Sequence, residues 1–154
     1  MTILCVDCWN PIDQTGRCSI CGWMKSDVEG FPVYMSTTDR ADRDFEAYRE
    51  NYSQIAVDDL KHSIQNLTYL DIQARNFREY VGDVDGLDVC EIGVGQGTLL
   101  RSLLMDQPKS VVGVDISLEY LREIPTDPRL KLLIANAERL PFRESFDLVT
   151  SADV

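Results

Sequence analysis

The stretch Leu87-Asp88-Val89-Cys90-Glu91-Ile92-Gly93-Val94-Gly95-Gln96-Gly97 decides the fold of this chain. It starts as a short β-prone run and ends in three glycines at alternate positions. Glycine tolerates positive φ and lets a ligand approach the backbone closely. Leucines at positions 99, 100, 103 and 104 then have the spacing of one helix face. The stretch therefore predicts a strand, a ligand-binding turn and a helix.

Three further apolar runs follow, at residues 110–116, at residues 130–135, and from Phe146 to Val149. Ser117 and Pro125 bound a short helical stretch after the first of these runs. Strands that alternate with helices predict βαβ units and a parallel sheet. Near-continuous apolar strands are typical of a sheet covered on both faces. We therefore expect an α/β fold with a doubly wound parallel sheet.

Polar residues follow the second and third predicted strands. Asp115 lies 20 residues after Gly95 and ends its strand, where a carboxylate can accept from both hydroxyls of a ribose. Asn136-Ala137-Glu138 lies at the carboxyl edge where open α/β sheets bind ligands. The third glycine comes one residue too early for a dinucleotide fingerprint, and no Lys precedes Ser or Thr as in a P-loop.

These motifs continue into Arg139-Leu140-Pro141-Phe142 and Phe146-Asp147, and residues 87–154 resemble the first half of a class I S-adenosylmethionine-dependent methyltransferase. The resemblance implies a Rossmann-like sheet whose first four strands lie in the spatial order 3-2-1-4. Since the family sheet has seven strands, the resemblance also implies a truncated chain whose fourth strand is an open edge.

The resemblance assigns the cofactor contacts to the turn and to the next two strand ends, namely Glu91, Gly93, Gly95, Gly97, Asp115, Ile116, Asn136 and Ala137. The turn would hold the methionine portion, and Asp115 the ribose. Ile116 would pack on the adenine, and Asn136 and Ala137 would contact the adenine edge. The family usually has an acid at the position of Asn136. Tyr48 and Tyr52 precede the sheet, and helix packing is slightly favoured for them over cofactor contact. No catalytic residue is assigned, although Asp153 is a candidate base.

Four of the five cysteines form two Cys-x-x-Cys knuckles, Cys5-Val6-Asp7-Cys8 and Cys18-Ser19-Ile20-Cys21. This doubled spacing is typical of a zinc ribbon, and four sulfur ligands leave no open position for catalysis. Two disulfides or a redox pair are the alternatives, but no thioredoxin-like context surrounds either knuckle. We expect Cys90, inside the first predicted strand, to be a buried small hydrophobe.

The sequence thus divides into a zinc ribbon at 1–24, a linker at 25–38 that ends in a helix cap, leading helices at 39–82, and the cofactor-binding half of a methyltransferase domain at 83–154. No apolar run approaches the ~20 residues of a membrane span, and the N-terminus does not resemble a secretory signal. We therefore expect a cytoplasmic protein with reduced thiols.

The net charge of −11 argues against a nucleic-acid partner, because basic residues are scattered singly among acids. We expect an S-adenosylmethionine-dependent methyltransferase that acts on a small-molecule or glycan acceptor. The first alternative is ribosomal RNA base methylation, since some RNA guanine methyltransferases resemble this chain in having an N-terminal four-cysteine zinc site. Arg17 is the only basic residue between Cys8 and Cys21, which counts against an RNA-binding role of this module.

A second alternative is a zinc-ribbon module that binds a protein partner and carries a non-catalytic methyltransferase-like domain. The intact Glu91, the three glycines and Asp115 count against such degeneration. RNA and protein partners both stay open at this point.

Overall fold

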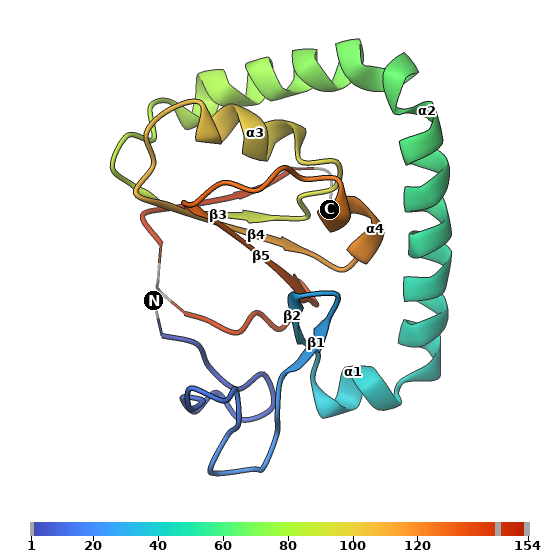
Figure 1. Cartoon of the computed structure of the whole chain (residues 1–154), viewed down its shortest axis with the longest axis vertical. Coiled ribbons are helices and arrows are strands. Elements are labelled where there is room, and N and C mark those ends of the chain that lie inside the picture. The colour runs from blue at the N-terminus through green and yellow to red at the C-terminus, as the bar shows by residue number, and fades with distance from the viewer. Residues whose placement is uncertain (1, 144–145, 153–154) are drawn as a thin grey trace.

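A six-stranded sheet with the strand order β1-β2-β5-β4-β3-β6 organises the chain (Figure 1). The computed structural model describes residues 2–143 and 146–152, with no side-chain description for 63–68. The strands are β1 (Ser26–Val28), β2 (Phe31–Tyr34), β3 (Asp88–Ile92), β4 (Ser110–Asp115), β5 (Leu130–Ala135) and β6 (Leu148–Ser151). The helices are α1 (Thr37–Ala41), α2 (Arg43–Val81), α3 (Thr98–Leu104) and α4 (Leu118–Arg122).

The four strands from β3 to β6 are parallel and confirm the expected arrangement. β3 pairs with β4 on one side and with β6 on the other, and β5 pairs with the far side of β4. The spatial order is β5-β4-β3-β6. Counted along the sequence from β3, these are the third, second, first and fourth strands, so the expected order 3-2-1-4 is present. The carboxyl ends of all four strands meet at one edge of the sheet, which is where the glycine-rich turn begins.

The segment 25–38, expected to be a linker, instead contains a β-hairpin that extends the sheet. β1 and β2 are antiparallel, and β2 runs parallel to β5 with Val33 opposite Ile134. Glu29 and Gly30 form the two-residue turn, both with positive φ, as the tightest hairpins require. The strands have only three and four residues and include Pro32, which weakens their sequence pattern. The expected helix cap is present, because the Ser36 side chain accepts from the Asp39 N–H.

Side chains on one face of the sheet form a core with α3 and the end of α2. Val89 and Val111 point to this face, where Leu100 and Leu103 of α3 are fully buried. Phe77 and Val81 of α2 pack against the same cluster. Burial of this apolar surface is the main contribution to the stability of the sheet and of the helices that cover this face.

The opposite face of the sheet packs against the cysteine-containing N-terminal module. Cys5, Val6 and Cys18 are fully buried in a cluster that also contains Val112 and Leu133 of the sheet. A backbone hydrogen bond from the Leu4 N–H to the Pro141 carbonyl, 2.7 Å long, joins the module to the loop after β5. Residues 2–24 therefore share a core with the sheet.

Helix α2 contributes to two different parts of the molecule. Figure 1 shows its first half passing the carboxyl ends of the strands and its second half lying over α3. The Tyr120 hydroxyl of α4 donates to Asp59 of α2 at 2.7 Å and fixes the first half beside the sheet edge. Within the described residues, none of the helices is long and apolar enough to span a membrane.

Candidate functional site

The glycine-rich turn between β3 and α3 has the conformation that its sequence predicts. Gly93, Gly95 and Gly97 all have positive φ, the left-handed region that other residues rarely adopt. At Gly97 a Cβ would lie 2.9 Å from Cγ1 of Ile124, so the packing also excludes a side chain. The turn is therefore fixed both by backbone conformation and by close contact with the residues after α4.

Most N–H groups of this turn are already used inside the chain. Those of Gly93 and Val94 donate to the Val114 carbonyl, and that of Gly97 donates to the Val94 carbonyl. The Gly95 N–H donates to Asp115 Oδ2 at 2.7 Å. A phosphate site needs free N–H donors, so this turn is poorly suited to bind a phosphate. It favours a ligand that donates hydrogen bonds or carries positive charge.

Asp115, at the end of β4, is held by the turn on one side and by α4 on the other. Its Oδ1 accepts from the Ser117 N–H at 2.8 Å, while its Oδ2 accepts from Gly95. Burial raises the pKa of this carboxyl, and the backbone hydrogen bonds oppose that shift. Each oxygen keeps a second lone pair, so the carboxylate can still accept from a ligand hydroxyl.

Glu91, near the end of β3, has a buried carboxyl oxygen without a partner among the described residues. The side chain is only 3% exposed, and Oε2 makes no hydrogen bond. Burial, and secondarily the charge of Asp115, raise the pKa of this carboxyl to about 8, and Arg101 opposes the shift. A buried acceptor without a donor is costly to the fold, so a ligand that supplies a cation or a donor there gains binding energy.

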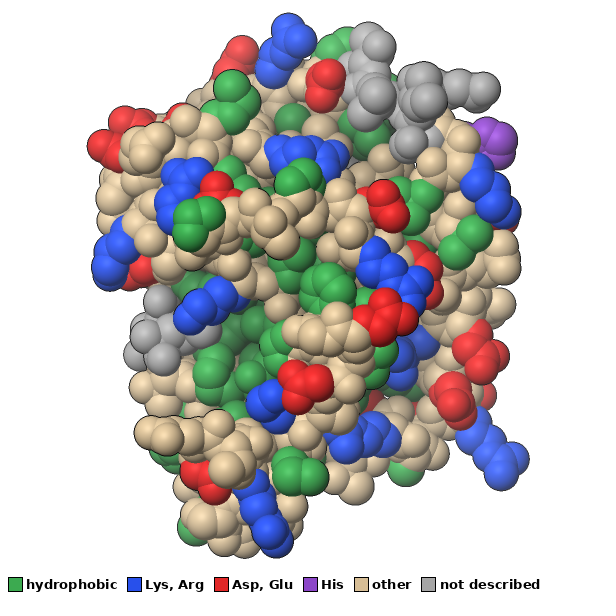
Figure 2. All heavy atoms as spheres, in the orientation of Figure 1, with side chains coloured by type: hydrophobic (Ala, Val, Ile, Leu, Met, Phe, Trp, Pro, Cys, Tyr) green, Lys and Arg blue, Asp and Glu red, His purple; other side chains and the backbone are tan. Residues whose placement is uncertain are grey.

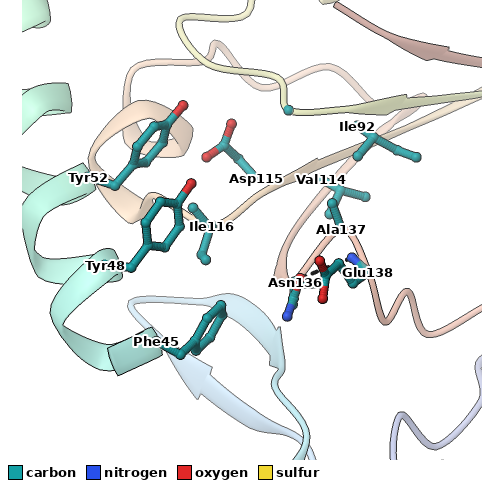
Figure 3. A pocket seen from close by; sticks show the side chains of 12 residues that line it. Phe45, Tyr48, Tyr52, Ile92, Val114, Asp115, Ile116, Asn136, Ala137 and Glu138 are labelled. Carbon is teal, nitrogen blue, oxygen red and sulfur yellow. Dashed lines mark hydrogen bonds between the residues drawn. The ribbon is translucent and has the colours of Figure 1, made fainter. Parts of the chain in front are cut away.

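A cavity of about 350 Å³ lies beside the ends of β4 and β5 (Figure 3). Phe45, Tyr48 and Tyr52 of α2 stack in a column along one wall, with neighbouring ring centroids 6.3 and 5.9 Å apart. Ile116 and Asp115 lie beside this column. Tyr48 and Tyr52 thus line a cavity, and Tyr52 also packs edge-to-face against Tyr120 of α4. Tyr48 follows Phe45 by three residues and Tyr52 follows Tyr48 by four, and this spacing was the sequence signal for a shared helix face.

Asn136, Ala137 and Glu138 line the far wall of the same cavity, opposite the aromatic column (Figure 3). The Asn136 side chain is held at both ends. Its Oδ1 accepts from the Glu138 N–H at 3.0 Å, and its Nδ2 donates to Asp39 Oδ1 of α1 at 3.1 Å. The cavity thus lies between stacked rings and a fixed amide, which suits a planar ligand with a polar edge.

A second cavity of about 660 Å³ continues from the first, with Tyr52 and Gly93 lining both. It lies between α2 and the glycine-rich turn and reaches Ser151 at the end of β6. Its charged lining residues in the described chain are Asp59 and Glu91, and no Lys or Arg is among them. Asp153, the candidate base, lies outside the described residues.

The eight predicted cofactor-site residues come together at this edge of the sheet. Seven of them line one or both cavities: Glu91, Gly93, Gly95, Asp115, Ile116, Asn136 and Ala137. The eighth, Gly97, lines neither cavity and contributes through the conformation of the turn. Two residues of the site were not predicted from the sequence. These are Phe45, which lines the first cavity, and Asp39, which accepts a hydrogen bond from the Asn136 side chain.

The four knuckle cysteines form a second cluster, away from the cavities. The sulfur atoms of Cys5, Cys8, Cys18 and Cys21 all lie within 4.8 Å of one another. A tetrahedral ion with Zn–S bonds of ~2.3 Å places its sulfurs ~3.8 Å apart, so this set fits zinc. The Asn10 amide donates to Cys8 Sγ at 3.4 Å, which stabilises the thiolate that a metal needs.

The two knuckles repeat the same backbone geometry. In the first, the Trp9 N–H donates to the Cys5 carbonyl, and in the second the Gly22 N–H donates to the Cys18 carbonyl. Both Trp9 and Gly22 have positive φ, of 61° and 79°. Glycine accommodates this conformation easily, whereas tryptophan rarely does. Trp9 is therefore the strained residue of the two, and the Cys-x-x-Cys pattern did not indicate this strain.

Both tryptophans are engaged inside the molecule. Trp23 Nε1 donates to the Met35 carbonyl at 3.0 Å, and its ring stacks on Tyr34. The Arg143 guanidinium lies 4.2 Å from the centre of the Trp9 ring. These contacts connect the module to β2 and to the loop after β5. Cys90 is fully buried, and burial raises its pKa to about 12, as expected of a structural cysteine.

Replacing Glu91 by Gln should flatten the pH dependence of stability. The folded chain keeps the Glu91 proton up to about pH 8, whereas an unperturbed carboxyl releases it near 4.5, so the folded state loses stability as pH rises between these values. We expect urea unfolding to show a smaller loss between pH 5.5 and pH 8 in Glu91→Gln, by roughly 1–3 kcal/mol. The exposed Glu79→Gln is the control, and an unchanged slope in Glu91→Gln contradicts the assignment.

Comparisons with known proteins agree with this geometry. Residues 89–154 match the family model described as a methyltransferase domain. Phosphoethanolamine N-methyltransferase 1 of Haemonchus contortus, solved with phosphoethanolamine and S-adenosylhomocysteine, has a TM-score of 0.53 at 18% identity, over 69% of this chain and 25% of that one. A Haloferax volcanii complex of the Trm112 methyltransferase activator with a methyltransferase has a TM-score of 0.50 at 22% identity, over 67% of this chain and 46% of that one.

An S-adenosylmethionine-dependent methyltransferase of Mesorhizobium loti has a TM-score of 0.47 at 26% identity, over 50% of this chain and 37% of that one. The chain spans less than half the length of each of these structures. A search of curated proteins finds no match. The family match covers residues 89–154, less than half of the chain, and together with the strand order it supports a class I S-adenosylmethionine-dependent methyltransferase fold for this part.

Proposed function

We propose that the protein binds S-adenosylmethionine at the carboxyl edge of the sheet and transfers its methyl group to a small-molecule acceptor. The observation that carries the cofactor assignment is the buried, unpartnered Oε2 of Glu91 beside a turn whose N–H groups are already used. A positively charged ligand group can pair with the Glu91 carboxyl and needs no N–H donor from the turn. A phosphate would be repelled by a carboxylate and would lack N–H donors. The ammonium of the methionine portion has the required charge.

The remaining cofactor contacts follow from the first cavity. The Asp115 carboxylate accepts from the ribose hydroxyls, and Ile116 packs on one side of the adenine. The aromatic column of α2 covers the other side, with Tyr48 nearest to the middle of the wall (Figure 3). Asn136 Oδ1 accepts from the adenine amino group, and Ala137 lies beside the same edge. When bound, S-adenosylmethionine supplies a methyl group on a sulfonium, which is open to in-line attack.

The second cavity is the proposed acceptor side of the site. It is about 660 Å³, larger than the methionine portion needs, and it falls in the size range of small-molecule pockets. Asp59 and Glu91 are its charged lining residues within the described chain, so a neutral or cationic acceptor fits better than a phosphate-rich one. This chain's contribution to catalysis is to hold donor and acceptor in line and to exclude water.

Ribosomal RNA and glycan acceptors have weaker support. On the face in Figure 2, Lys and Arg side chains are interspersed with Asp and Glu, without the basic patch that a nucleic-acid surface needs. Trp9 and Trp23, the aromatic residues of the zinc module that a base would stack on, are engaged in internal contacts. No comparable feature of the cavities selects for a sugar.

We also propose that the knuckle cysteines hold a structural zinc ion. Four sulfur ligands complete a tetrahedron and leave no position for water or substrate. The ion would act by fixing the two knuckles, whose buried side chains belong to the core on this face of the sheet. The module's location is cytoplasmic in this proposal, where thiols stay reduced.

The cofactor contact of Tyr48 is tested by a matched pair of tyrosine variants on α2. Tyr48 and Tyr69 are both more than half exposed, but only Tyr48 lines the cavity. We expect Tyr48→Ala to weaken S-adenosylmethionine binding about three- to tenfold in calorimetry, because stacking on the adenine is lost. Tyr69→Ala should bind like the unaltered protein. Equal affinities of all three proteins contradict the assignment, and a lack of binding by the unaltered protein contradicts the cofactor proposal itself.

The acceptor class is tested with methyl-labelled cofactor, the protein and a fractionated cell extract. We expect label in the small-molecule fraction and none in RNA, because the lining of the second cavity has no described basic residue. The control omits the protein. Label in RNA, lost on ribonuclease treatment, contradicts the acceptor proposal but leaves the cofactor site in place.

The zinc proposal is tested at Cys21, which is exposed and therefore contributes little packing. An exposed Cys→Ser change is normally within about 0.5 kcal/mol of neutral. We expect Cys21→Ser to lose the zinc found by metal analysis and to lower the melting temperature of the whole chain in one transition, because the module and the sheet share a core. Ser19→Ala, in the same knuckle and also exposed, is the control. Retention of one zinc per chain, or an unchanged melting temperature, contradicts the proposal.

A further inference from the structure

The Asn136 side chain is held by a contact that comes from far away in the sequence. Its Nδ2 donates to Asp39 Oδ1 at 3.1 Å, across 97 positions of the chain. The other oxygen of Asp39 accepts from the Ser36 N–H at 3.0 Å and from the Ser36 hydroxyl at 2.7 Å. The Asp39 carboxylate therefore caps α1 with one oxygen and fixes the Asn136 amide with the other.

The pairing of β2 with β5 explains why these two residues meet. Tyr34 lies opposite Ala135 in a parallel register, so the two chains leave the sheet side by side. One continues through Ser36 into α1, and the other continues directly into Asn136. The hairpin added to the edge of the sheet thus brings the start of α1 to the wall of the first cavity.

The same junction between β2 and α1 is held by the cysteine module. Asp7, between the two cysteines of the first knuckle, accepts from the Thr37 N–H at 2.8 Å and from the Thr37 hydroxyl at 2.5 Å. Trp23, two residues after Cys21, donates to the Met35 carbonyl at 3.0 Å. The knuckles therefore contact the residues on both sides of buried Ser36.

We infer that the cysteine module positions the adenine-reading amide of Asn136 through Asp7, Thr37 and Asp39. This inference rests on the proposed function, since it takes the first cavity as the adenine site. Asn136 contacts the ligand, whereas Asp7, Thr37 and Asp39 are positioning residues. Because the knuckles fix Asp7, metal binding there and cofactor binding at the sheet edge strengthen each other, as thermodynamic linkage requires.

The contact between Asp39 and Asn136 is tested by exchanging the two side chains. Asn136→Asp sets two carboxylates against each other, and Asp39→Asn sets an amide donor against an amide donor. With both changes, the carboxylate at position 136 accepts from the amide at position 39, while the amide oxygen at 39 still caps Ser36. We expect each single variant to bind S-adenosylhomocysteine about tenfold more weakly, and the double variant to recover most of that loss. Asp44→Asn is the control for charge, since Asp44 is exposed on α2.

Additive losses in the double variant overturn the Asp39–Asn136 part of the inference, because residues in contact should be energetically coupled. A second ligand separates positioning from general stability. The analogue of S-adenosylhomocysteine with a 6-oxo purine lacks the amino group that Asn136 Oδ1 accepts from. The unaltered protein should prefer the amino form, and Asp39→Asn should lose that preference. A variant that weakens both ligands equally has only a structural defect and counts against positioning.

The contribution of the module is tested by Asp7→Ala against Asp13→Ala. Asp13 lies between the knuckles, where its side chain accepts from Thr15 and Arg17 within the module. We expect Asp7→Ala to keep its zinc, to bind S-adenosylhomocysteine several-fold more weakly and to lose preference for the amino purine. Asp13→Ala should match the unaltered protein. Unchanged affinity and preference in Asp7→Ala overturn the inference.

The side-chain amide signal of Asn136 in NMR spectra gives a readout without any ligand. We expect it to shift in Asp7→Ala and in Asp39→Asn and to stay in place in Asp13→Ala. If the unaltered protein binds no S-adenosylhomocysteine, the proposed function fails, while this signal still reports the coupling. An Asn136 signal that is the same in all four proteins overturns the inference on its own.

Discussion

The hydrogen bond from the Gly95 N–H to Asp115 Oδ2, 2.7 Å long, is the constraint on which the rest of the site depends. It ties the turn after β3 to the end of β4, so the two neighbouring strand ends form one rigid surface. It also uses the N–H group that a phosphate would need and leaves a buried carboxylate in its place. With Glu91 buried nearby, the edge of the sheet favours a cationic ligand with hydroxyl groups.

The hairpin and the cysteine module extend this surface away from the turn. β2 pairs with β5 at the edge of the sheet, so α1 and α2, which follow β2, begin near the carboxyl ends of the strands. The rings of Phe45, Tyr48 and Tyr52 on α2 then form one wall of the first cavity. The module covers the opposite face of the sheet and contacts the chain on both sides of Ser36. The cysteine module is therefore part of the core on this face of the sheet, and it contacts the segment that leads into α1.

Local patterns in the sequence were sufficient for much of the fold. The alternating glycines predicted the turn, because few other residues adopt positive φ, and the apolar runs predicted four parallel strands. The spatial order of these strands came from the family resemblance. The doubled knuckle predicted the cysteine cluster. The hairpin at residues 26–34 was missed, because strands of three and four residues with Pro32 carry almost no periodic signal. The contact between Asp39 and Asn136 depends on the pairing of β2 with β5, which no local pattern encodes.

A crystal structure with S-adenosylhomocysteine tests the central claim most directly, namely that the edge formed by the ends of β3, β4 and β5 is the cofactor site. The account predicts adenine between the aromatic column of α2 and Ile116, its amino group on Asn136, the ribose hydroxyls on Asp115 and the ammonium near Glu91. A ligand bound elsewhere, or one with its ammonium away from Glu91 and its ribose away from Asp115, contradicts the account.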